Sequence, residues 1–400
     1  MDQLTNASGV KESVEKIWFR KLASAVIDAD RCIQCASCIA ACPSHSLSIA
    51  EDDRPTLVRM CTGCSFCWDF CPRGGLRNER LWKLEGGEEA VEGIGPVLNA
   101  HTARALQPAT NVQDGGVVTT ILRALLEKGE IQGALIAKRS ETSPLRGEPY
   151  IARTVEDINR NAGSFYNQTL ALVALMDTSN WTLPPDASIA VVGTPCEISG
   201  IKALQRFPWP LRKTHHSAVK YTVSLMCTRS FNLGRLLQRL KTQGVDLSSA
   251  TRIDVKKNIL TVYNADGSSI YAGNVRRFRD AALRGCDECA DFSGKLADIS
   301  VGSVGSPKGY STVLVRTIQG LKAWKTAESN LERRDVDDLN AVIRVEEKNK
   351  HEALHAMKRK FHPDSPVWVP YEEHTLGYRD TDRAPVKPAT YRIHHYEITC

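Results

Sequence analysis

The chain has 400 residues, of which 42% are hydrophobic and 24% are charged, and its formal net charge is +6. This composition is typical of a globular protein of two or three domains, and the modest charge does not indicate a nucleic-acid partner. The sequence contains no run of 18 apolar residues, and its start lacks the basic and then apolar pattern of a secretory signal. We therefore expect a cytoplasmic protein without a transmembrane segment, at most peripheral to a membrane complex.

Two cysteine runs near the N-terminus, residues 32–43 and 61–72, share the spacing C-x2-C-x2-C-x3-C-P. In bacterial ferredoxins this spacing binds two [4Fe-4S] clusters, and the fourth cysteine of each run ligates the cluster of the other run. The predicted ligands are Cys32, Cys35, Cys38 and Cys71 for one cluster, and Cys61, Cys64, Cys67 and Cys42 for the other. Zinc and disulfides are the alternatives, but zinc normally takes four ligands from paired C-x2-C elements, and clustered cysteines fit a reducing compartment.

The sequence predicts an α/β core domain preceded by a bacterial-type ferredoxin domain of the α+β class. Residues 1–24 are a lead-in, and residues 25–85 form the ferredoxin-like domain. A glycine-rich linker then opens residues 86–330, where helical and strand patterns alternate as in an α/β domain. Residues 331–400 are predicted to be a charged helical segment and an extended tail that wraps the body or docks a partner.

Hydrophobic periodicity predicts the elements of the core in chain order. Helical spacing is found in segments that alternate with short apolar strands, and Asp266-Gly267 marks the turn of a β-hairpin. The expected elements are a helix at 118–125, a strand at 133–139, a helix at 164–176, a strand at 188–193, a helix at 197–207, a strand at 221–227, a helix at 233–240, a hairpin over 252–272, and strands at 297–305 and 311–317.

Four further cysteines lie within the predicted core. Cys196 and Cys227 lie at or just beyond strand ends, and Cys286 and Cys289 form a C-x2-C pair. Strand ends on one edge of an open α/β sheet converge, so these four thiols could hold a third cubane cluster. The alternative is that the first two are ordinary buried cysteines and the pair is a zinc half-site or a redox pair. Cys400 is expected to be a free surface thiol.

Two glycine-containing turns have the form of a cofactor cradle. Residues 114–120 place glycines before a helix, and residues 191–197 lead from a strand into a helix. Helix N-termini present free N–H groups to an anion, and glycine allows a ligand to approach the backbone closely. Neither turn matches the G-x-G-x-x-G fingerprint, so simple turns remain the alternative for each.

The ordered series GGVVT, GALIA, SFYN, VVGTPCEISGIKAL, SLMCTRSF and CDECADFSGKLADISVGSVGSPKGYSTVLVRT resembles the beta-subunit family of coenzyme F420-reducing hydrogenases and F420-dependent formate dehydrogenases. The resemblance covers about residues 25–325, and the fused ferredoxin makes the chain similar to the input subunit of F420H2 dehydrogenases. It implies a core that binds FAD, reacts with F420 and carries a [4Fe-4S] cluster on Cys196, Cys227, Cys286 and Cys289.

The same resemblance implies the residues that line the cofactors. Ser303 stands where the family commonly has an acidic residue, so no role is carried over to that position. Four arginines that precede the C-x2-C pair, Arg276, Arg277, Arg279 and Arg284, are candidates for attracting the anionic F420, with a solvated charged loop as the alternative. The implied cofactor-binding residues are Gly115, Gly116, Val118, Thr119, Gly193, Thr194, Pro195, Asp298, Gly302 and Gly305.

The resulting hypothesis is an oxidoreductase that moves electrons between coenzyme F420 and a partner redox protein or complex. FAD would exchange a hydride with F420 and single electrons with the three [4Fe-4S] clusters, and no catalytic side chain is required for hydride transfer itself. Two alternatives keep the same cysteines. The chain could be a ferredoxin-dependent reductase of another organic substrate, such as a chlorophyll-type pigment, or a flavin-free electron-transfer adaptor.

Overall fold

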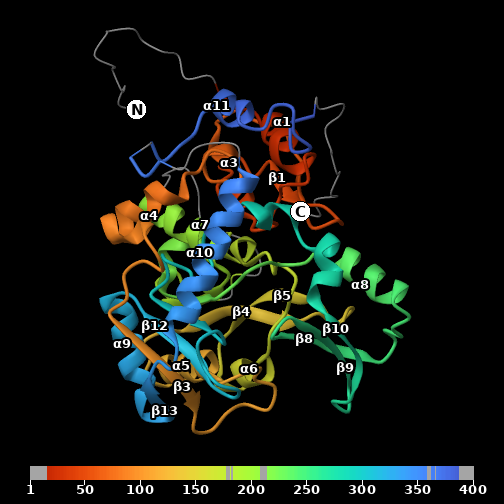
Figure 1. Ribbon diagram of the computed structural model, residues 1–400. Helices are drawn as coiled ribbons and strands as arrows, with labels where there is room; N and C mark the ends of the chain where they lie inside the picture. The colour runs from red at the N-terminus through yellow and green to blue at the C-terminus, as the bar shows by residue number, and fades with distance from the viewer. Residues whose placement is uncertain are drawn as a thin grey trace.

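A computed structural model describes residues 16–176, 181, 183–207, 214–357, 362–364 and 366–386. A ferredoxin module, here residues 17–86, lies at one end of the molecule, and a large sheet covered by helices lies at the other (Figure 1). The helix α10 (Leu339–Ala356) runs between them. This confirms the predicted α/β core with an N-terminal ferredoxin domain. None of the described helices is both long enough and apolar enough to cross a bilayer.

The ferredoxin module has the two-fold plan that its paired cysteine runs predict. Each run bends into a short helix just after a residue with positive φ, Ala36 at 62° and Ser65 at 71°. Ile17, Phe19 and Leu22, which lie within the predicted lead-in, are part of the hydrophobic core of the module. Its elements are α1 (Phe19–Leu22), η1 (Ala23–Ile27), α2 (Ser37–Ala40), β1 (Leu47–Ile49), β2 (Pro55–Leu57), α3 (Phe66–Asp69) and α4 (Asn78–Gly86).

The core is built on an eight-stranded mixed sheet with the order β13-β3-β12-β11-β7-β6-β4-β5. The four strands β11, β7, β6 and β4 are parallel, and antiparallel strands extend the sheet on both sides. The strands are β3 (Asn99–Ala105), β4 (Gly133–Arg139), β5 (Gly147–Ala152), β6 (Ile189–Gly193), β7 (Val219–Leu225), β11 (Ile299–Gly302), β12 (Ser311–Val315) and β13 (Leu331–Asp335).

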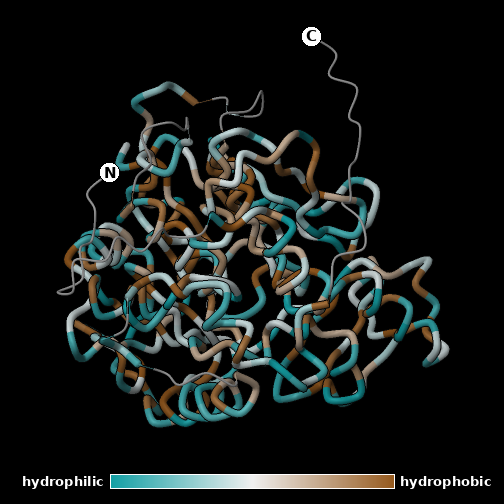
Figure 2. Tube along the Cα trace, turned by 90° about the horizontal axis from the view of Figure 1, so that it is seen from above, coloured by the Kyte–Doolittle hydropathy of each residue, from teal (hydrophilic) through white to brown (hydrophobic). Residues whose placement is uncertain are grey.

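Helices cover both faces of this sheet. The helices α5 (Val117–Glu127) and α9 (Ile318–Ala327) share one hydrophobic core with one face. The helix α7 (Pro195–Arg206) shares another core with the opposite face and with the ferredoxin module, so the module and the sheet are packed through one continuous apolar layer. Figure 2 shows hydrophilic segments along the outer loops and hydrophobic segments within.

The predicted hairpin is part of a small three-stranded antiparallel sheet. The turn between the last two strands of this sheet lies at Asp266-Gly267, as predicted. A tight turn with positive φ at Lys257 and Asn258 connects them to a further strand on the N-terminal side. The helix α8 (Leu233–Thr242) and the 3-10 helix η5 (Val275–Ala281) pack against it. The strands are β8 (Ala250–Lys256), β9 (Ile259–Asn264) and β10 (Ser269–Asn274).

One predicted helix is wrong in its extent. Residues 164–176 contain only the 3-10 helix η3 (Ala171–Leu175), because Asn167 and Gln168 use their side-chain amides for hydrogen bonds outside any helical ladder. Three strands, β3, β5 and β13, were not predicted. The remaining short helices are α6 (Val155–Arg160), η2 (Glu88–Val91), η4 (His215–Ala218), η6 (Arg284–Glu288), η7 (Glu328–Asn330) and α11 (Tyr371–Leu376).

Residues 366–386 form a C-terminal segment that lies across the ferredoxin module. Trp68 Nε1 donates a hydrogen bond to the Val369 carbonyl at 2.8 Å, and the backbone of Val369 donates to the Gly75 carbonyl at 2.6 Å. The segment also contains α11, which includes the buried His374. The predicted tail thus contacts the body in its described part, whereas Cys400 lies outside the described residues.

Candidate redox centres

The first four-thiol set, here called the inner ferredoxin site, comprises Cys32, Cys35, Cys38 and Cys71. Burial raises the pKa of the Cys38 thiol well above its ordinary value, and the neighbouring charges of Cys71 and Cys32 raise it further. Burial also raises the pKa of Cys71 to about 12, with Cys35 as the next cause. The last cysteine of the second run therefore lies beside the first run, which is the arrangement that the ferredoxin spacing predicts.

The second set, the outer ferredoxin site, comprises Cys42, Cys61, Cys64 and Cys67, and all four line one hollow. Burial raises the pKa of Cys67 well above its ordinary value, followed by the charges of Cys61 and Cys42. This set is closer to the surface, because Met60 beside it is 86% exposed and Trp18, which lies against the Cys61–Cys64 loop at Gly63, is 46% exposed.

The third set, the core site, comprises Cys196, Cys227, Cys286 and Cys289. Cys196 lies in the first turn of α7 just beyond β6, and Cys227 follows the neighbouring parallel strand β7, so both are at the same edge of the sheet. Cys286 lies within η6 and Cys289 caps it. Burial raises the pKa of Cys227, and the charges of Cys286 and Cys289 add to this increase. The pKa of Cys196 is raised by burial, then by Cys35 and Glu197, and also by Cys289.

The donor chemistry of the three sets fits [4Fe-4S] clusters. The twelve cysteines of the three sets are free thiols, and each is buried or half-buried. Several buried thiolates in one place repel each other, and a metal that ligates them removes the cost of deprotonation. Soft thiolate ligands are typical of iron-sulfur clusters. Within the described residues no three His, Cys, Asp or Glu side chains are placed to hold a single metal ion. The ligand assignments remain predictions.

The inner ferredoxin site and the core site are neighbours. A β-carbon at Gly285 would lie 2.0 Å from the Arg31 carbonyl oxygen, so only glycine permits this approach between the residues that precede Cys286 and Cys32. A β-carbon at Gly200 in α7 would lie 2.4 Å from Ser37 Oγ in α2. The loops that bear the two thiol sets are thus in direct backbone contact.

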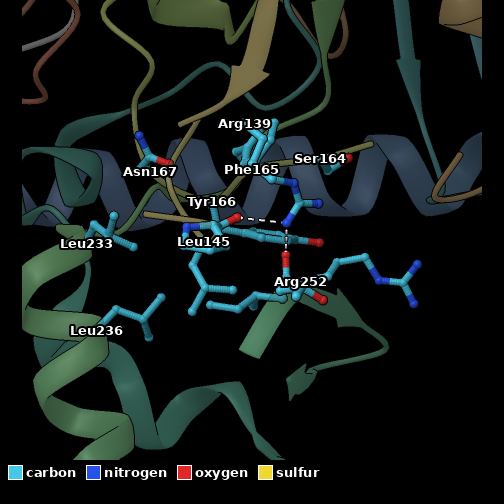
Figure 3. A pocket seen from close by; sticks show the side chains of 12 residues that line it. Arg139, Leu145, Ser164, Phe165, Tyr166, Asn167, Leu233, Leu236 and Arg252 are labelled. Atoms are coloured by element: carbon cyan, nitrogen blue, oxygen red, sulfur yellow. Dashed lines mark hydrogen bonds between the residues drawn. The ribbon is translucent and has the colours of Figure 1, made fainter. Parts of the chain in front are cut away.

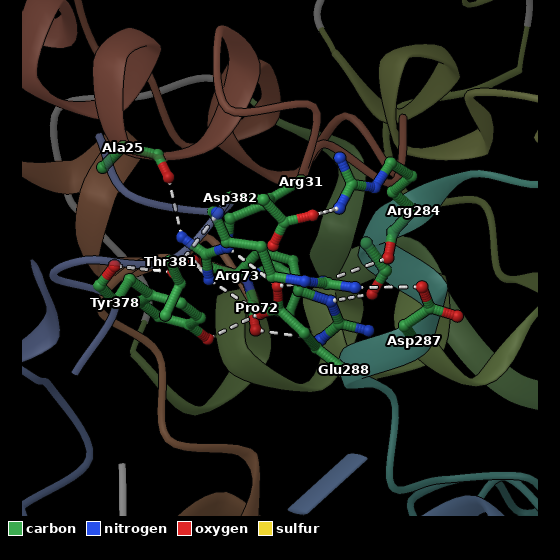
Figure 4. Close-up of polar contacts among 12 residues, drawn as sticks. Ala25, Arg31, Pro72, Arg73, Arg284, Asp287, Glu288, Tyr378, Thr381 and Asp382 are labelled. Atoms are coloured by element: carbon green, nitrogen blue, oxygen red, sulfur yellow. Dashed lines mark hydrogen bonds and ion pairs between the residues drawn. The ribbon is translucent and has the colours of Figure 1, made fainter. Parts of the chain in front are cut away.

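Charged side chains join these loops to the C-terminal segment (Figure 4). Arg31 donates to both carboxylate oxygens of Glu288, at 2.8 and 2.7 Å, with side-chain exposures of 1% and 2%. Arg383 Nη1 donates to the same carboxylate at 2.9 Å, as does the Tyr378 hydroxyl. Burial alone would raise the pKa of Glu288, but Arg31 and the other nearby cations lower it to about 2. Glu288 is therefore a carboxylate that holds three segments together.

Most of the glycines implied in flavin binding converge on the carboxyl edge of the sheet. Gly115 and Gly116 follow β3, Gly193 ends β6, and Gly302 ends β11. A β-carbon at Gly115 would lie 2.4 Å from the Ala103 carbonyl oxygen, so the loop packs tightly against the strand end before α5 begins. This edge is the one that ligands of open α/β sheets occupy.

The remaining implied residues have varied surroundings. Val118 and Thr119 are half-buried in the first turn of α5, and Gly305 lies in the turn after β11. Thr194 caps α7, donating to Glu197 at 2.9 Å, and Pro195 occupies the first turn.

Asp298 is separated from this edge. It precedes β11, at the opposite end of the strand from Gly302. Its carboxylate accepts hydrogen bonds from the Thr222 backbone at 2.8 Å, from the Thr222 hydroxyl at 2.7 Å and from the Thr317 hydroxyl at 2.7 Å. These contacts join β7, β11 and α9. The structure therefore gives Asp298 a role in strand registration and does not bring it to the glycines.

The candidate arginines are spread over two environments. Arg276, Arg277 and Arg279 lie on η5 beside the small sheet. Arg284 forms an ion pair with Asp382 of the C-terminal segment. Their attraction for F420 stays a prediction.

A further hollow lies between the end of β4 and the small sheet (Figure 3). Arg139 crosses it and donates to the Pro144 carbonyl at 2.9 Å. The Tyr166 hydroxyl accepts hydrogen bonds from Gln113 Nε2 at 2.7 Å and from the Val255 backbone at 2.8 Å. Because Gln113 is two residues before Gly115, these contacts tie the glycine loop to the small sheet.

Sequence reasoning missed Gln168 and Arg73 as members of the site. Gln168 Nε2 donates to Cys196 Sγ at 3.1 Å, and Thr194 Oγ1 lies 3.2 Å from the same sulfur. Hydrogen bonds to ligand sulfurs tune iron-sulfur clusters. Neither residue belongs to a recognisable motif, although Arg73 directly follows the predicted ligand Cys71 and Pro72, and this position could have indicated it.

Comparison with known proteins decides the family. Models described as "Coenzyme F420 hydrogenase/dehydrogenase, beta subunit" match residues 100–176 for the N-terminal part and 186–338 for the C-terminal part, together more than half of the chain. A 4Fe-4S dicluster domain matches residues 25–76. The chain belongs to the coenzyme F420 hydrogenase/dehydrogenase beta-subunit family. Its three thiol sets thus lie in a family member with a fused dicluster domain.

The proteins that this chain resembles include a reductase, a dehydrogenase component and a chain of a hydrogenase complex. The chain is 30% identical to coenzyme F420-dependent sulfite reductase of Methanocaldococcus jannaschii over 74% of this chain, but spans only 46% of that protein. It is 27% identical to a component of the F(420)H(2) dehydrogenase of Methanosarcina mazei, over 77% of this chain and 85% of that component. A chain of the F420-reducing [NiFe] hydrogenase complex from Methanosarcina barkeri matches with a TM-score of 0.60 and 27% identity, covering 66% of this chain and 92% of that one.

Proposed function

We propose that the chain transfers electrons between coenzyme F420 and a partner redox protein, using FAD and three [4Fe-4S] clusters. Membership of the family supports electron transfer that involves F420. The observation that carries the finer proposal is the backbone contact of Gly285 with Arg31, which joins a four-thiol set in the F420-type core to a four-thiol set in the ferredoxin module. The flavin-free adaptor keeps the same core cysteines and shares this junction, so the presence of flavin is what distinguishes the two functions.

The order of the centres follows from the same contacts. The core site lies at the sheet edge, where most of the glycines proposed to bind the cofactor converge, and it adjoins the inner ferredoxin site. The outer ferredoxin site is the one next to exposed side chains, of which Met60 is 86% exposed. We therefore place F420 at the core and the partner protein at the outer ferredoxin site, with flow in either direction.

The chain supplies binding and orientation at the core. When bound, FAD exchanges a hydride with a two-electron carrier and single electrons with iron-sulfur clusters. Gly115 lets its loop pack against the Ala103 carbonyl, and Gly193 leaves room for the Glu197 side chain, so the two glycines fix the turns at this edge of the sheet. The hydroxyl of Thr194 and the amide of Gln168 fix the orientation of the Cys196 sulfur. None of these residues has to donate or accept a proton during hydride transfer.

The test uses the full chain purified and kept under anaerobic conditions. We expect roughly twelve irons and twelve sulfides per chain, with four of each per cluster, together with one flavin. Addition of F420H2 should bleach the flavin absorbance and support the reduction of a viologen dye. A second sample, exchanged into fresh buffer and treated with dithionite, gives the reference spectrum of the fully reduced protein.

Each result that differs from these expectations would contradict a different part of the proposal. About eight irons instead of twelve would remove the core cluster from the proposal. A flavin that dithionite bleaches but F420H2 does not would show that another organic molecule is the substrate. Cluster-replete protein without flavin would show that the chain is an electron-transfer adaptor.

A further inference from the structure

Arg73 occupies the junction between the core site and the inner ferredoxin site. It follows Cys71 and Pro72 and is only 4% exposed. Its Nε donates to the Gly285 carbonyl at 2.6 Å, and its Nη1 donates to the Pro72 carbonyl at 3.0 Å. Its side chain also hydrogen-bonds the Cys289 thiol, while its backbone N–H hydrogen-bonds the Cys71 thiol. One residue thus contacts a candidate ligand of each set.

Arg73 differs from the other arginines at this junction in the groups that balance its charge. The buried Arg31 and the half-buried Arg383 both form ion pairs with Glu288, at 2.7 and 2.9 Å. Among the residues that the structure describes, no carboxylate oxygen lies within ion-pair distance of Arg73, and its hydrogen bonds go to carbonyls and thiols. The negative groups that balance this guanidinium are therefore chiefly the candidate ligands.

The electrostatics agree with this placement. Burial opposes the charged form of Arg73, yet its pKa is raised, because the negative charges of Cys289 and then Glu288 outweigh the loss of solvent. Cys286 and Cys196 act in the same direction. In the ferredoxin module Arg73 also stabilises the thiolate forms of Cys35 and Cys71. The cation therefore acts on both thiol sets at once.

We propose that Arg73 sets the reduction potentials of the core site and the inner ferredoxin site, raising both through one shared positive charge. Reduction adds an electron to a cluster, and a fixed buried cation stabilises the added negative charge where the dielectric constant is low. Raising both potentials together lets the centres accept electrons from the same donor. This inference rests on the cluster sites of the proposed function, and is independent of FAD and F420.

The test is a potentiometric titration monitored by electron paramagnetic resonance on the full chain, with iron and sulfide counted for every sample. Arg73→Gln removes the charge and keeps an amide donor for the Gly285 carbonyl. Arg73→Lys keeps the charge. The matched control is Arg77→Gln, since Arg77 is similarly buried, lies four residues away and pairs with Glu373 of the C-terminal segment at 2.7 Å.

We expect Arg73→Gln to make reduction of both neighbouring clusters at least tenfold less favourable, a shift of about 59 mV for a one-electron couple. Arg73→Lys should retain most of the wild-type potential, and Arg77→Gln should match the wild type. The cluster of the outer ferredoxin site serves as an internal reference and should be unchanged in all three variants.

Several results would overturn the inference. These are unchanged potentials in iron-replete Arg73→Gln, an equal shift in Arg73→Lys, or an equal shift of all three clusters. If Arg73→Gln loses only the irons of the core site, the reduction potential of the inner ferredoxin cluster still tests the inference. Loss of both clusters in Arg73→Gln but not in Arg73→Lys would make Arg73 an assembly residue instead. Wild-type protein without a core cluster would refute the proposed function itself, which the iron count shows separately.

Discussion

At the scale of single residues, burial determines whether a titratable side chain is charged or neutral in the folded protein, and His101 is an example. It lies in β3 with its ring 4.8 Å from that of Trp324 and nearly parallel to it, at 9°. Neither ring nitrogen has a hydrogen-bond partner among the described residues. Burial, followed by the charge of Arg333, lowers the pKa of His101. The neutral imidazole is thus the form that the sheet stabilises.

A pH dependence of stability follows. The unfolded chain protonates this histidine near pH 6.5, and the folded protein does so only at lower pH, so protonation favours unfolding as the pH falls through that window. One such group contributes at most about 1.4 kcal/mol per pH unit. His101→Phe keeps a ring against Trp324 but cannot titrate. Its apparent Tm, followed anaerobically by circular dichroism, should fall less than the wild-type value between about pH 7.5 and about pH 5.5.

The control for this experiment is His355→Phe, because His355 is exposed on α10. That variant should retain the pH sensitivity of the wild type. Identical pH sensitivity in the wild type and His101→Phe would show that the buried imidazole does not contribute.

At the scale of elements, the C-terminal segment links the two halves of the electron-transfer unit. It binds the ferredoxin module through Trp68 and Gly75, and it binds the loop of the core site through Arg383, which pairs with Asp287 and Glu288 at 2.9 Å each. The sequence predicted a tail that could wrap the body, but charge and proline content cannot indicate which surface such a tail covers.

Removal of this segment should loosen the ferredoxin module. Truncation after residue 365 deletes the hydrogen bonds of Val369 and the ion pairs of Arg383, and three such contacts at about 1 kcal/mol each correspond to about a hundredfold change in a local opening equilibrium. Iron release to a chelator should therefore be at least tenfold faster than in the full chain. Truncation after residue 386 retains the whole described segment and is the matched control. Equal release rates for the two truncations would show that the segment does not protect the clusters.

At the scale of the whole molecule, the sequence predicts what depends on local pattern. Continuous apolar runs identified β4, β6 and β7, since strands buried on both faces have that composition. The strands β3 and β13 escaped prediction because polar residues interrupt their apolar pattern, and in β13, at the edge of the sheet, only Leu331 is buried. Cysteine spacing predicted the two ferredoxin sets, whereas the core set was predicted from strand-end positions together with the family resemblance. The pairing of Arg31 with Glu288 could not be predicted, because those residues are 257 positions apart and meet only after folding.

The order of the three centres leads to a final prediction about the complete chain. If the core site is the link between the flavin and the ferredoxin module, Cys227→Ala should contain about eight irons, keep the flavin and still lose flavin absorbance on addition of F420H2. The two ferredoxin clusters should then remain oxidised with F420H2 for many turnover times of the wild type, yet become reduced with dithionite. Cys400→Ala is the control and should behave as the wild type. Rapid reduction of the ferredoxin clusters by F420H2 in Cys227→Ala would show that electrons bypass the core site, because the donor must then reach the ferredoxin module by another route.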